Sequence, residues 1–178
     1  MTNHDTELLL MPEVRNALET HGIDHEVLPC PDELSDTAAF CDHYGVPLNQ
    51  AANTIVVTSR KTEPAVQAIC VVLGTSRLDV NKKVRELLGA KKASFADAEL
   101  TMQLTGMQIG GVTPFGVRSG ESGELPVYVD TAVLGQDHVI MGGGNRTSKL
   151  RLAPTELRKL PGVVVVEGLA ALRGPEPA

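Results

Sequence analysis

The sequence is poor in aromatic residues: phenylalanine, tyrosine and tryptophan together make up 3%, and tryptophan is absent. Proteins that bind single-stranded nucleic acid by stacking its bases need a series of exposed aromatic side chains. Three phenylalanines and two tyrosines spread over 178 residues do not form such a series. The composition therefore argues against a base-stacking platform.

Cysteine is also scarce, and the three thiols of Cys30, Cys41 and Cys70 are widely separated, with no C-x-x-C pair. This spacing predicts neither a disulfide framework nor a zinc site, so we expect reduced, buried thiols. His21 and His25 are separated by Gly22, where the preceding helix is expected to end, so they do not share one helical face as metal ligands. We expect no metal and no cofactor.

Long apolar runs are missing as well, and the first residues lack the basic and apolar parts of a signal peptide. We expect a cytoplasmic protein that has no membrane partner. Hydrophobic residues make up 42% and charged residues 21%, a globular composition. The length predicts one domain over residues 1–178, with a core at about 12–168 and frayed termini.

The net charge of −6 is unevenly distributed, because residues 1–50 carry −9 and residues 51–178 carry +3. Basic residues gather at 82–92, which includes Lys82 and Lys83, and at 146–159, which includes Arg146 and Lys149. These groups are interpreted either as contacts to nucleic-acid phosphates or as solvated helix faces.

The periodicity of apolar residues and the Gly and Pro breaks predict alternating helices and short strands. The order does not follow a regular βαβ repeat, so we predict an α+β fold with a mixed, largely antiparallel sheet and flanking helices. The expected helices are Pro12–His21, Asp36–Tyr44, Asn81–Leu88, Ala96–Leu104 and Pro154–Leu160, and the expected strands are Asp24–Leu28, Thr54–Thr58, Ala65–Leu73, Pro126–Asp130, His138–Met141, Lys149–Leu152 and Val163–Val166.

Two glycine-rich segments are candidate binding loops. Gly110–Gly116 lies in a loop at 106–123, where glycines let backbone N–H groups approach a ligand and Pro114 fixes the shape, as in a pocket for a carbonyl or an oxyanion. An ordinary surface turn is the alternative. Gly142–Gly144 is either a backbone surface for a ligand or a permissive hairpin turn. No motif of a covalent nucleophile is present.

Several of these motifs, in this order, resemble the YbaK/prolyl-tRNA synthetase-associated domain family. The matching segments are Asn81–Phe95, Leu104–Gly106, Gly110–Gly116, Pro126–Asp130 and Leu152–Leu157. The resemblance spans about residues 12–168 and implies a YbaK-like editing domain that hydrolyses mischarged aminoacyl-tRNA in trans, mainly on proline tRNA. The partners it implies are aminoacyl-tRNA and an aminoacyl-tRNA synthetase, with no DNA.

The resemblance also assigns roles to residues. The family's G-x-x-x-P loop falls on Gly110, Gly111, Val112, Thr113 and Pro114, whose backbone would hold the aminoacyl ester while water attacks its carbonyl. The residues expected to bind the rest of the substrate are Thr54, Phe115, Gly142, Gly143, Gly144 and Asn145, and those expected to contact tRNA are Lys82, Lys83 and Arg146.

One position departs from the family pattern, since Asn53 stands where the family commonly has a lysine. An amide donates a hydrogen bond but supplies no positive charge, and charge-assisted hydrogen bonds are the stronger kind. With Asn53 as a catalytic residue, a deacylase would rely on the loop and on the substrate's own hydroxyl. The alternatives are a non-catalytic binder of a tRNA end, nucleotide or aminoacyl derivative, and a structural partner of a synthetase.

Overall fold

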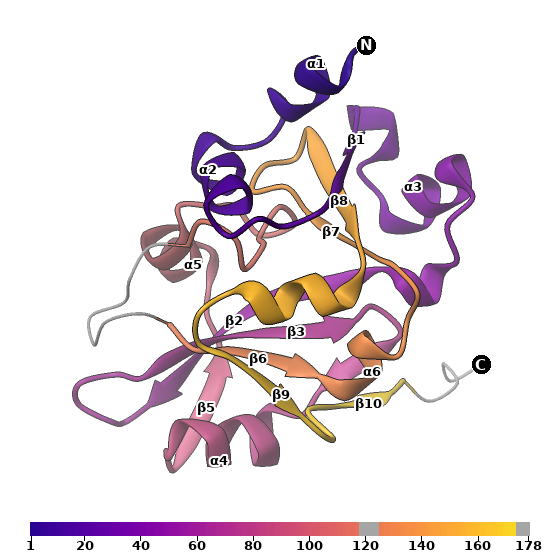
Figure 1. Ribbon diagram of the computed structural model, residues 1–178. Helices are drawn as coiled ribbons and strands as arrows, with labels where there is room; N and C mark the ends of the chain where they lie inside the picture. Colours follow the sequence, from indigo (N-terminus) through magenta and orange to yellow (C-terminus); the bar gives the residue numbers. More distant parts are fainter. Residues whose placement is uncertain (118–124, 174–178) are drawn as a thin grey trace.

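The computed structural model describes residues 1–117 and 125–173. A five-stranded sheet in the order β5-β2-β3-β6-β9 forms the centre, and a three-stranded sheet, β1-β8-β7, stands above it in Figure 1. The short strands β4 and β10 pair with each other beside the larger sheet. The strands are β1 (Glu26–Pro29), β2 (Ala52–Arg60), β3 (Gln67–Leu73), β4 (Ser76–Leu78), β5 (Lys92–Phe95), β6 (Val127–Asp130), β7 (Val139–Gly142), β8 (Ser148–Leu152), β9 (Val163–Val166) and β10 (Ala170–Leu172).

Helices surround these sheets, with α2 above the larger sheet, α5 at one side and α4 below it in the same view (Figure 1). Three further segments are single 3₁₀ turns or short 3₁₀ helices, and one is a π-helical turn. The helices are α1 (Asn3–Glu7), α2 (Pro12–Thr20), α3 (Thr37–Tyr44), α4 (Arg85–Leu88), α5 (Ala98–Thr105) and α6 (Thr131–Leu134); the 3₁₀ segments are η1 (Asp32–Leu34), η2 (Leu48–Gln50) and η4 (Pro154–Lys159), and the π turn is η3 (Val80–Val84).

The central strand β3 explains why the larger sheet is mixed. All seven of its residues are buried, as expected for a strand covered on both faces. It pairs antiparallel with the preceding strand β2 and parallel with β6, which in turn pairs parallel with β9. The smaller sheet and the β2–β5 pair are antiparallel. The predicted α+β class with a mixed, largely antiparallel sheet is confirmed.

The strand β2 separates two hydrophobic cores, because successive side chains on a strand point to opposite faces. Val56 packs into the larger core between the two sheets, together with Val14 and Leu18 of α2. Val57 packs into the second core on the other face, against Leu88 of α4. The middle of β2 therefore packs against a core on each face of the sheet.

The start of β2 also joins the two sheets. Ala51, directly before β2, forms an isolated parallel bridge with Ile140 of β7. The end of β7 and the start of β2 therefore lie side by side, although they are far apart in the sequence. This junction positions the candidate site.

Most predicted helix ends agree with the structure. Asp36 caps α3 by accepting a hydrogen bond from the Ala39 N–H, and Gly45 ends that helix in the left-handed region. The helix expected at Asn81–Leu88 differs, since its first turn is π-helical: the Val84 N–H donates to the carbonyl of Asp79, five residues earlier, at 3.0 Å.

Some elements have no counterpart in the sequence prediction. The helix α1 precedes Pro12, where no element was expected, and a capping box between Thr2 and Asp5 begins it. Residues 118–123 of the predicted loop and the predicted frayed tail at 174–178 lie outside the described residues. No helix within 1–117 or 125–173 combines the length and the apolar character needed to cross a membrane.

Candidate functional site

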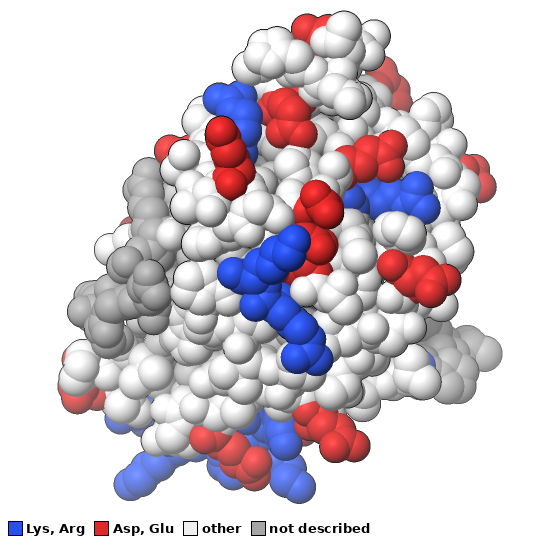
Figure 2. All heavy atoms as spheres, in the orientation of Figure 1, with Lys and Arg blue, Asp and Glu red and all other residues white. Residues whose placement is uncertain are grey.

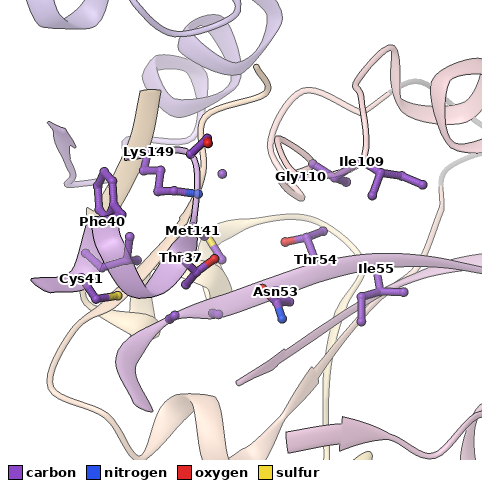
Figure 3. A pocket seen from close by; sticks show the side chains of 16 residues that line it. Thr37, Phe40, Cys41, Asn53, Thr54, Ile55, Ile109, Gly110, Met141 and Lys149 are labelled. Atoms are coloured by element: carbon purple, nitrogen blue, oxygen red, sulfur yellow. The ribbon is translucent and has the colours of Figure 1, made fainter. Parts of the chain in front are cut away.

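A pocket of about 330 Å³ lies at the junction of the two sheets (Figure 3). Its walls are the start of β2, the segment at 109–112, the end of β7 and one side of α3. The volume falls in the range typical of small-molecule sites, roughly 300–1,000 Å³. Of the residues predicted to bind substrate or to act in catalysis, those that line it are Asn53, Thr54, Gly110, Val112 and Gly142.

Close packing of two backbone segments forms one wall of the pocket. A Cβ atom on Gly142 would lie 2.6 Å from the carbonyl oxygen of Gly111 and 2.7 Å from that of Val112. A side chain at residue 142 is therefore excluded, and glycine lets the end of β7 press against the loop. The Gly144 N–H donates to the Gly111 carbonyl at 2.8 Å and holds the contact.

Within this wall, the N–H groups of Gly110 and Val112 make no backbone hydrogen bond in the described structure. The Gly111 N–H donates to the carbonyl of Gln108 at 2.9 Å, so it is already used. The Val112 N–H has no acceptor among the described residues, and Val112 lines the pocket. If the loop holds a carbonyl oxygen, as predicted, the N–H of Val112 is better placed to donate to it than that of Gly111.

The rest of the predicted loop belongs to the interior of the protein. Thr113 and Phe115 are fully buried, and Phe115 packs in the larger core. Pro114 is buried as well. These three residues do not line the pocket, so they shape the loop from behind and their side chains are not exposed to a ligand there.

Two polar residues at the start of β2 line the pocket, and their side chains lie on opposite faces of the strand, with the Thr54 hydroxyl on the side of Lys149 and Gly110 (Figure 3). Asn53 is exposed, and its amide makes no hydrogen bond to another described side chain or backbone group. The hydroxyl oxygen of Thr54 is buried and likewise has no hydrogen-bond partner in the described part of the chain. A buried hydroxyl without a partner is unfavourable, and a ligand that bonds to it removes that cost.

The triple-glycine turn contributes to the pocket only through Gly142. A Cβ on Gly143 would collide with Ser148, and one on Gly144 would lie 2.6 Å from the side chain of Val14. Both glycines thus allow close packing against neighbouring elements rather than forming a pocket floor.

Asn145 organises the same turn. Its amide donates to the carbonyl of Leu9 at 2.7 Å, and its side-chain oxygen accepts hydrogen bonds from Thr147 and Ser148. Because both ends of the amide are used inside the protein, the structure gives Asn145 a role in holding the turn against the N-terminal segment.

The predicted tRNA contacts lie in two separate places. The Arg146 side chain is exposed beside Gly110 and donates to the carbonyl of Ile109 at 3.3 Å, at the edge of the pocket. Lys82 and Lys83 lie in η3, outside the pocket lining. Basic side chains gather over α4 and β5 at the lower end of the molecule (Figure 2). A shallow hollow near Lys82 and Lys83 is lined by the basic residues Arg60, Lys61, Arg85, Lys91 and Lys92.

Two pocket walls were missed by sequence reasoning. Thr37, Phe40 and Cys41 of α3 line the pocket, and Tyr44 holds that helix in place by donating to the carbonyl of Pro29 at 2.6 Å. Lys149 of β8 also lines it, with its ammonium 5.5 Å from the centre of the Phe40 ring (Figure 3). The sequence placed Lys149 in a basic group but contained no signal that β8 reaches this pocket.

The thiol in the pocket wall is not activated. Burial raises the pKa of Cys41 above its ordinary value, and the neighbouring Lys149 ammonium only partly opposes that rise. A thiol with a raised pKa is a poor nucleophile at neutral pH. No group of three or more His, Cys, Asp or Glu side chains able to hold a metal ion occurs in the described ranges.

Comparisons with known proteins agree with this geometry. The chain is 33% identical over 118 residues to the uncharacterized protein YwhH of Bacillus subtilis (strain 168), covering 62% of this chain and 71% of that protein. A crystal structure of a candidate trans-editing enzyme for prolyl-tRNA synthetase superposes with a TM-score of 0.74 at 30% identity and covers 89% of this chain and 97% of that one. The hypothetical protein APE2540 shares the fold at 24% identity, with a TM-score of 0.77 over 89% of this chain and 99% of that one.

A family model provides the assignment. The model of the aminoacyl-tRNA editing domain matches residues 32–160, which contain α3, the start of β2, the loop wall and β8. The match covers most of the chain and every wall of the pocket. The chain therefore belongs to the aminoacyl-tRNA editing domain family and is YbaK-like, as its sequence motifs predict.

Proposed function

We propose that this protein hydrolyses mischarged aminoacyl-tRNA in trans, with proline tRNA as the expected carrier. The observation that carries the proposal is the Val112 N–H, a backbone donor without an acceptor that lies in the wall of a pocket of about 330 Å³. Two comparisons support the proposal. The chain belongs to the editing family, and it is similar to a candidate trans-editing enzyme for prolyl-tRNA synthetase.

In the proposed reaction, the ester carbonyl of the aminoacyl group lies against the 110–112 wall. A water molecule attacks the carbonyl carbon, and the Val112 N–H donates to the oxygen as negative charge develops on it. The bond from that carbon to the ribose oxygen then breaks, and the ribose oxygen takes up the proton that the water loses. The products are a free amino acid and an uncharged tRNA end.

The side chains of the pocket have separate roles in this proposal. Asn53 and Thr54 hydrogen-bond the substrate from β2, and Gly142 keeps the loop wall in place. The described lining residues include no carboxylate and no imidazole, so in this proposal the substrate's own vicinal hydroxyl relays the water's proton to the ribose oxygen that leaves. Phe40, Ile109 and Met141 give the pocket an apolar part, which favours an amino acid with an uncharged side chain.

The tRNA body is the proposed partner of the exposed basic residues. Arg146 lies next to the pocket, where the phosphates nearest the aminoacyl end would pass. Lys82 and Lys83 lie outside the pocket, beside the basic hollow, and would contact phosphates of the acceptor stem. A synthetase is the second proposed partner, and the cytoplasm, where tRNA is charged, is the proposed location.

A variant of Thr54 tests the proposal directly. Thr54→Val keeps the shape of the side chain and removes a hydroxyl that has no partner within the described structure. We expect unchanged or slightly higher stability, together with a roughly 2- to 10-fold slower single-turnover deacylation, the effect of one neutral hydrogen bond. The assay uses a panel of mischarged tRNAs.

Thr58→Val is the control for a lost threonine hydroxyl on the same face of β2 but outside this pocket. It also removes hydrogen bonds to Ser59 and Gln67, so it should lower stability and leave the saturating rate of deacylation unchanged. Deacylation that is equally fast in wild type and Thr54→Val would contradict the assignment of the pocket. A wild-type protein that binds tRNA tightly but cleaves no substrate in the panel would instead support the alternative function, a binder that has lost hydrolysis with the family lysine at Asn53. That reading gains weight if Asn53→Lys then acquires activity.

A further inference from the structure

We propose that Lys149 supplies the positive charge that the substrate pocket lacks at Asn53, so that the cation of the site comes from β8 instead of β2. This inference rests on the proposed function for its kinetic consequences. It concerns a residue of the smaller sheet that sequence motifs do not connect with the site.

The register of the smaller sheet directs Lys149 toward the loop wall. Lys149 is the cross-strand partner of Gly142, and paired residues on antiparallel strands present their side chains on the same face. On that face, the Cβ position of Gly142 points at the carbonyl oxygens of Gly111 and Val112. Lys149 therefore leaves β8 toward the segment that carries the free Val112 N–H. Figure 3 shows its ammonium extending into the space between α3 and Gly110.

The charge of Lys149 is not used elsewhere in the described structure. It forms no ion pair within 4.0 Å, whereas Arg151, two residues along the same strand, pairs with Glu26 at 3.8 Å. The described residues that line the pocket include no aspartate and no glutamate. A cation in a hollow without acidic neighbours attracts an anionic oxygen.

Phe40 holds the ammonium in position. Its ring is fully buried, and the nitrogen of Lys149 lies 5.5 Å from the ring centre, within the range of a cation–π contact. This contact orients the side chain without neutralising it, because the ring carries no net charge. The nitrogen keeps its hydrogen-bond donors for a ligand.

The anionic oxygen belongs either to the phosphate of the terminal nucleotide or to the ester oxygen as it gains charge. Both are oxygen anions that a lysine stabilises in the same way, and kinetics separates them. Loss of a phosphate contact raises the protein concentration needed for half-maximal rate, whereas loss of a contact to the developing oxyanion lowers the rate at saturation.

The test measures single-turnover deacylation of the best substrate in the panel by three variants. They are Lys149→Met, Lys149→Arg and a double variant that combines Asn53→Lys and Lys149→Met. Methionine keeps an unbranched apolar stem over Phe40 and removes the charged ammonium with its hydrogen-bond donors. We expect Lys149→Met to lose roughly 10- to 100-fold in either the saturating rate or the half-maximal concentration, the range for a hydrogen bond to a charged group. Lys149→Arg should keep most of the activity.

The double variant separates charge from packing. A lysine at Asn53 cannot restore packing against Phe40, so recovery of activity would show that the pocket requires a cation and accepts it from either wall. Arg151→Met is the control for a lost cation on the same strand and should stay within about fivefold of wild type. Thermal unfolding of every variant checks that the fold is retained.

The inference is overturned if Lys149→Met deacylates as fast as wild type, or if its loss is not recovered by Asn53→Lys while the fold is intact. Should Lys149→Met fail to fold, Lys149→Gln replaces it in both the single and the double variant, since glutamine also removes the charge and keeps a long side chain. If wild type cleaves no substrate, calorimetric titration with adenosine 5′-monophosphate replaces the kinetic readout. If adenosine 5′-monophosphate binds more weakly to Lys149→Met than to wild type, the charge assignment is upheld although the proposed function has failed. If the nucleotide binds both proteins equally, or binds neither, the charge assignment is overturned.

Discussion

The substitution Gly142→Ala tests the contact that builds the loop wall. The added Cβ would lie 2.6 Å from the Gly111 oxygen and 2.7 Å from the Val112 oxygen, and both neighbours are backbone atoms that cannot rotate away. Ordinary contact begins near 3.4 Å, so the loop must move by about 0.8 Å. Overpacking of this kind costs about 1–3 kcal/mol of unfolding free energy.

The displacement should affect activity more than stability. A shift approaching 1 Å in a group that positions the substrate costs on the order of 100-fold in rate, and the segment that moves carries the Val112 N–H. Urea unfolding monitored by circular dichroism gives the change in stability, and single-turnover deacylation gives the change in rate. Gly142 has an ordinary negative φ in its strand, so the expected effect is steric and not one of backbone strain.

The matched control is Gly135→Ala, since a Cβ there meets only the Ala132 oxygen at 3.5 Å and the φ of −77° suits any residue. It should be neutral or stabilising by about 0.4–1 kcal/mol. Equal stability and equal activity of the two variants would refute the argument that the bare backbone of Gly142 sets the position of the loop. Gly111→Val is a weaker test of the oxyanion donor, because its Cβ would collide with the Asn145 backbone at 2.6 Å and its N–H is already bonded.

Three further predictions concern stability and thiol chemistry. Asn145→Ala should lower the unfolding free energy by about 1–3 kcal/mol in urea denaturation, because its side chain bonds to Leu9 and to the turn; unchanged stability with lost substrate binding would instead assign it to the ligand. Burial raises the pKa of Cys70 to about 12, so a thiol reagent at pH 8 should modify it only after unfolding; rapid labelling of the native protein would contradict this. Hydrogen bonds from Lys159 and the Asp24 backbone hold the pKa of Glu156 below its ordinary value, so Glu156→Gln should be less stable than wild type at neutral pH. The difference in stability should vanish as the pH falls through that lowered pKa. A difference that persists in acid would have another cause.

The sequence predicted the fold best where local chemistry decides the structure. The capping Asp36 and the terminating Gly45 bound α3, and the β-branched run after Asn53 forms the first strand of the β2–β3 hairpin. The strand β5 was missed because its residues are exposed or half-buried and show no apolar alternation. Its existence depends on pairing with β2, which lies more than 30 residues earlier in the chain, and not on the local sequence.

The candidate loop shows a different limit. Sequence similarity treats Gly110–Phe115 as one functional unit, but in the structure Val112 borders both the pocket and the larger core, while Phe115 lies in the core and does not line the pocket. Which side of a loop meets the ligand depends on the elements packed behind it. The same holds for the triple-glycine turn, where Gly142 faces the loop wall and Gly144 faces Val14 of α2.

The position of Lys149 follows from the topology of the two sheets. The bridge between Ala51 and Ile140 brings β7 beside the start of β2, and the pairing of β7 with β8 then places Lys149 in the wall of the same pocket. A pocket formed at such a junction can receive a charged group from either sheet, since a charge acts through space and needs no particular position in the chain. A lysine can therefore be lost from one strand and its charge provided by another without changing the hydrophobic pattern of either. For that reason the asparagine at residue 53 excludes a lysine from β2 only, and the charge of the pocket as a whole must be judged from all of its walls.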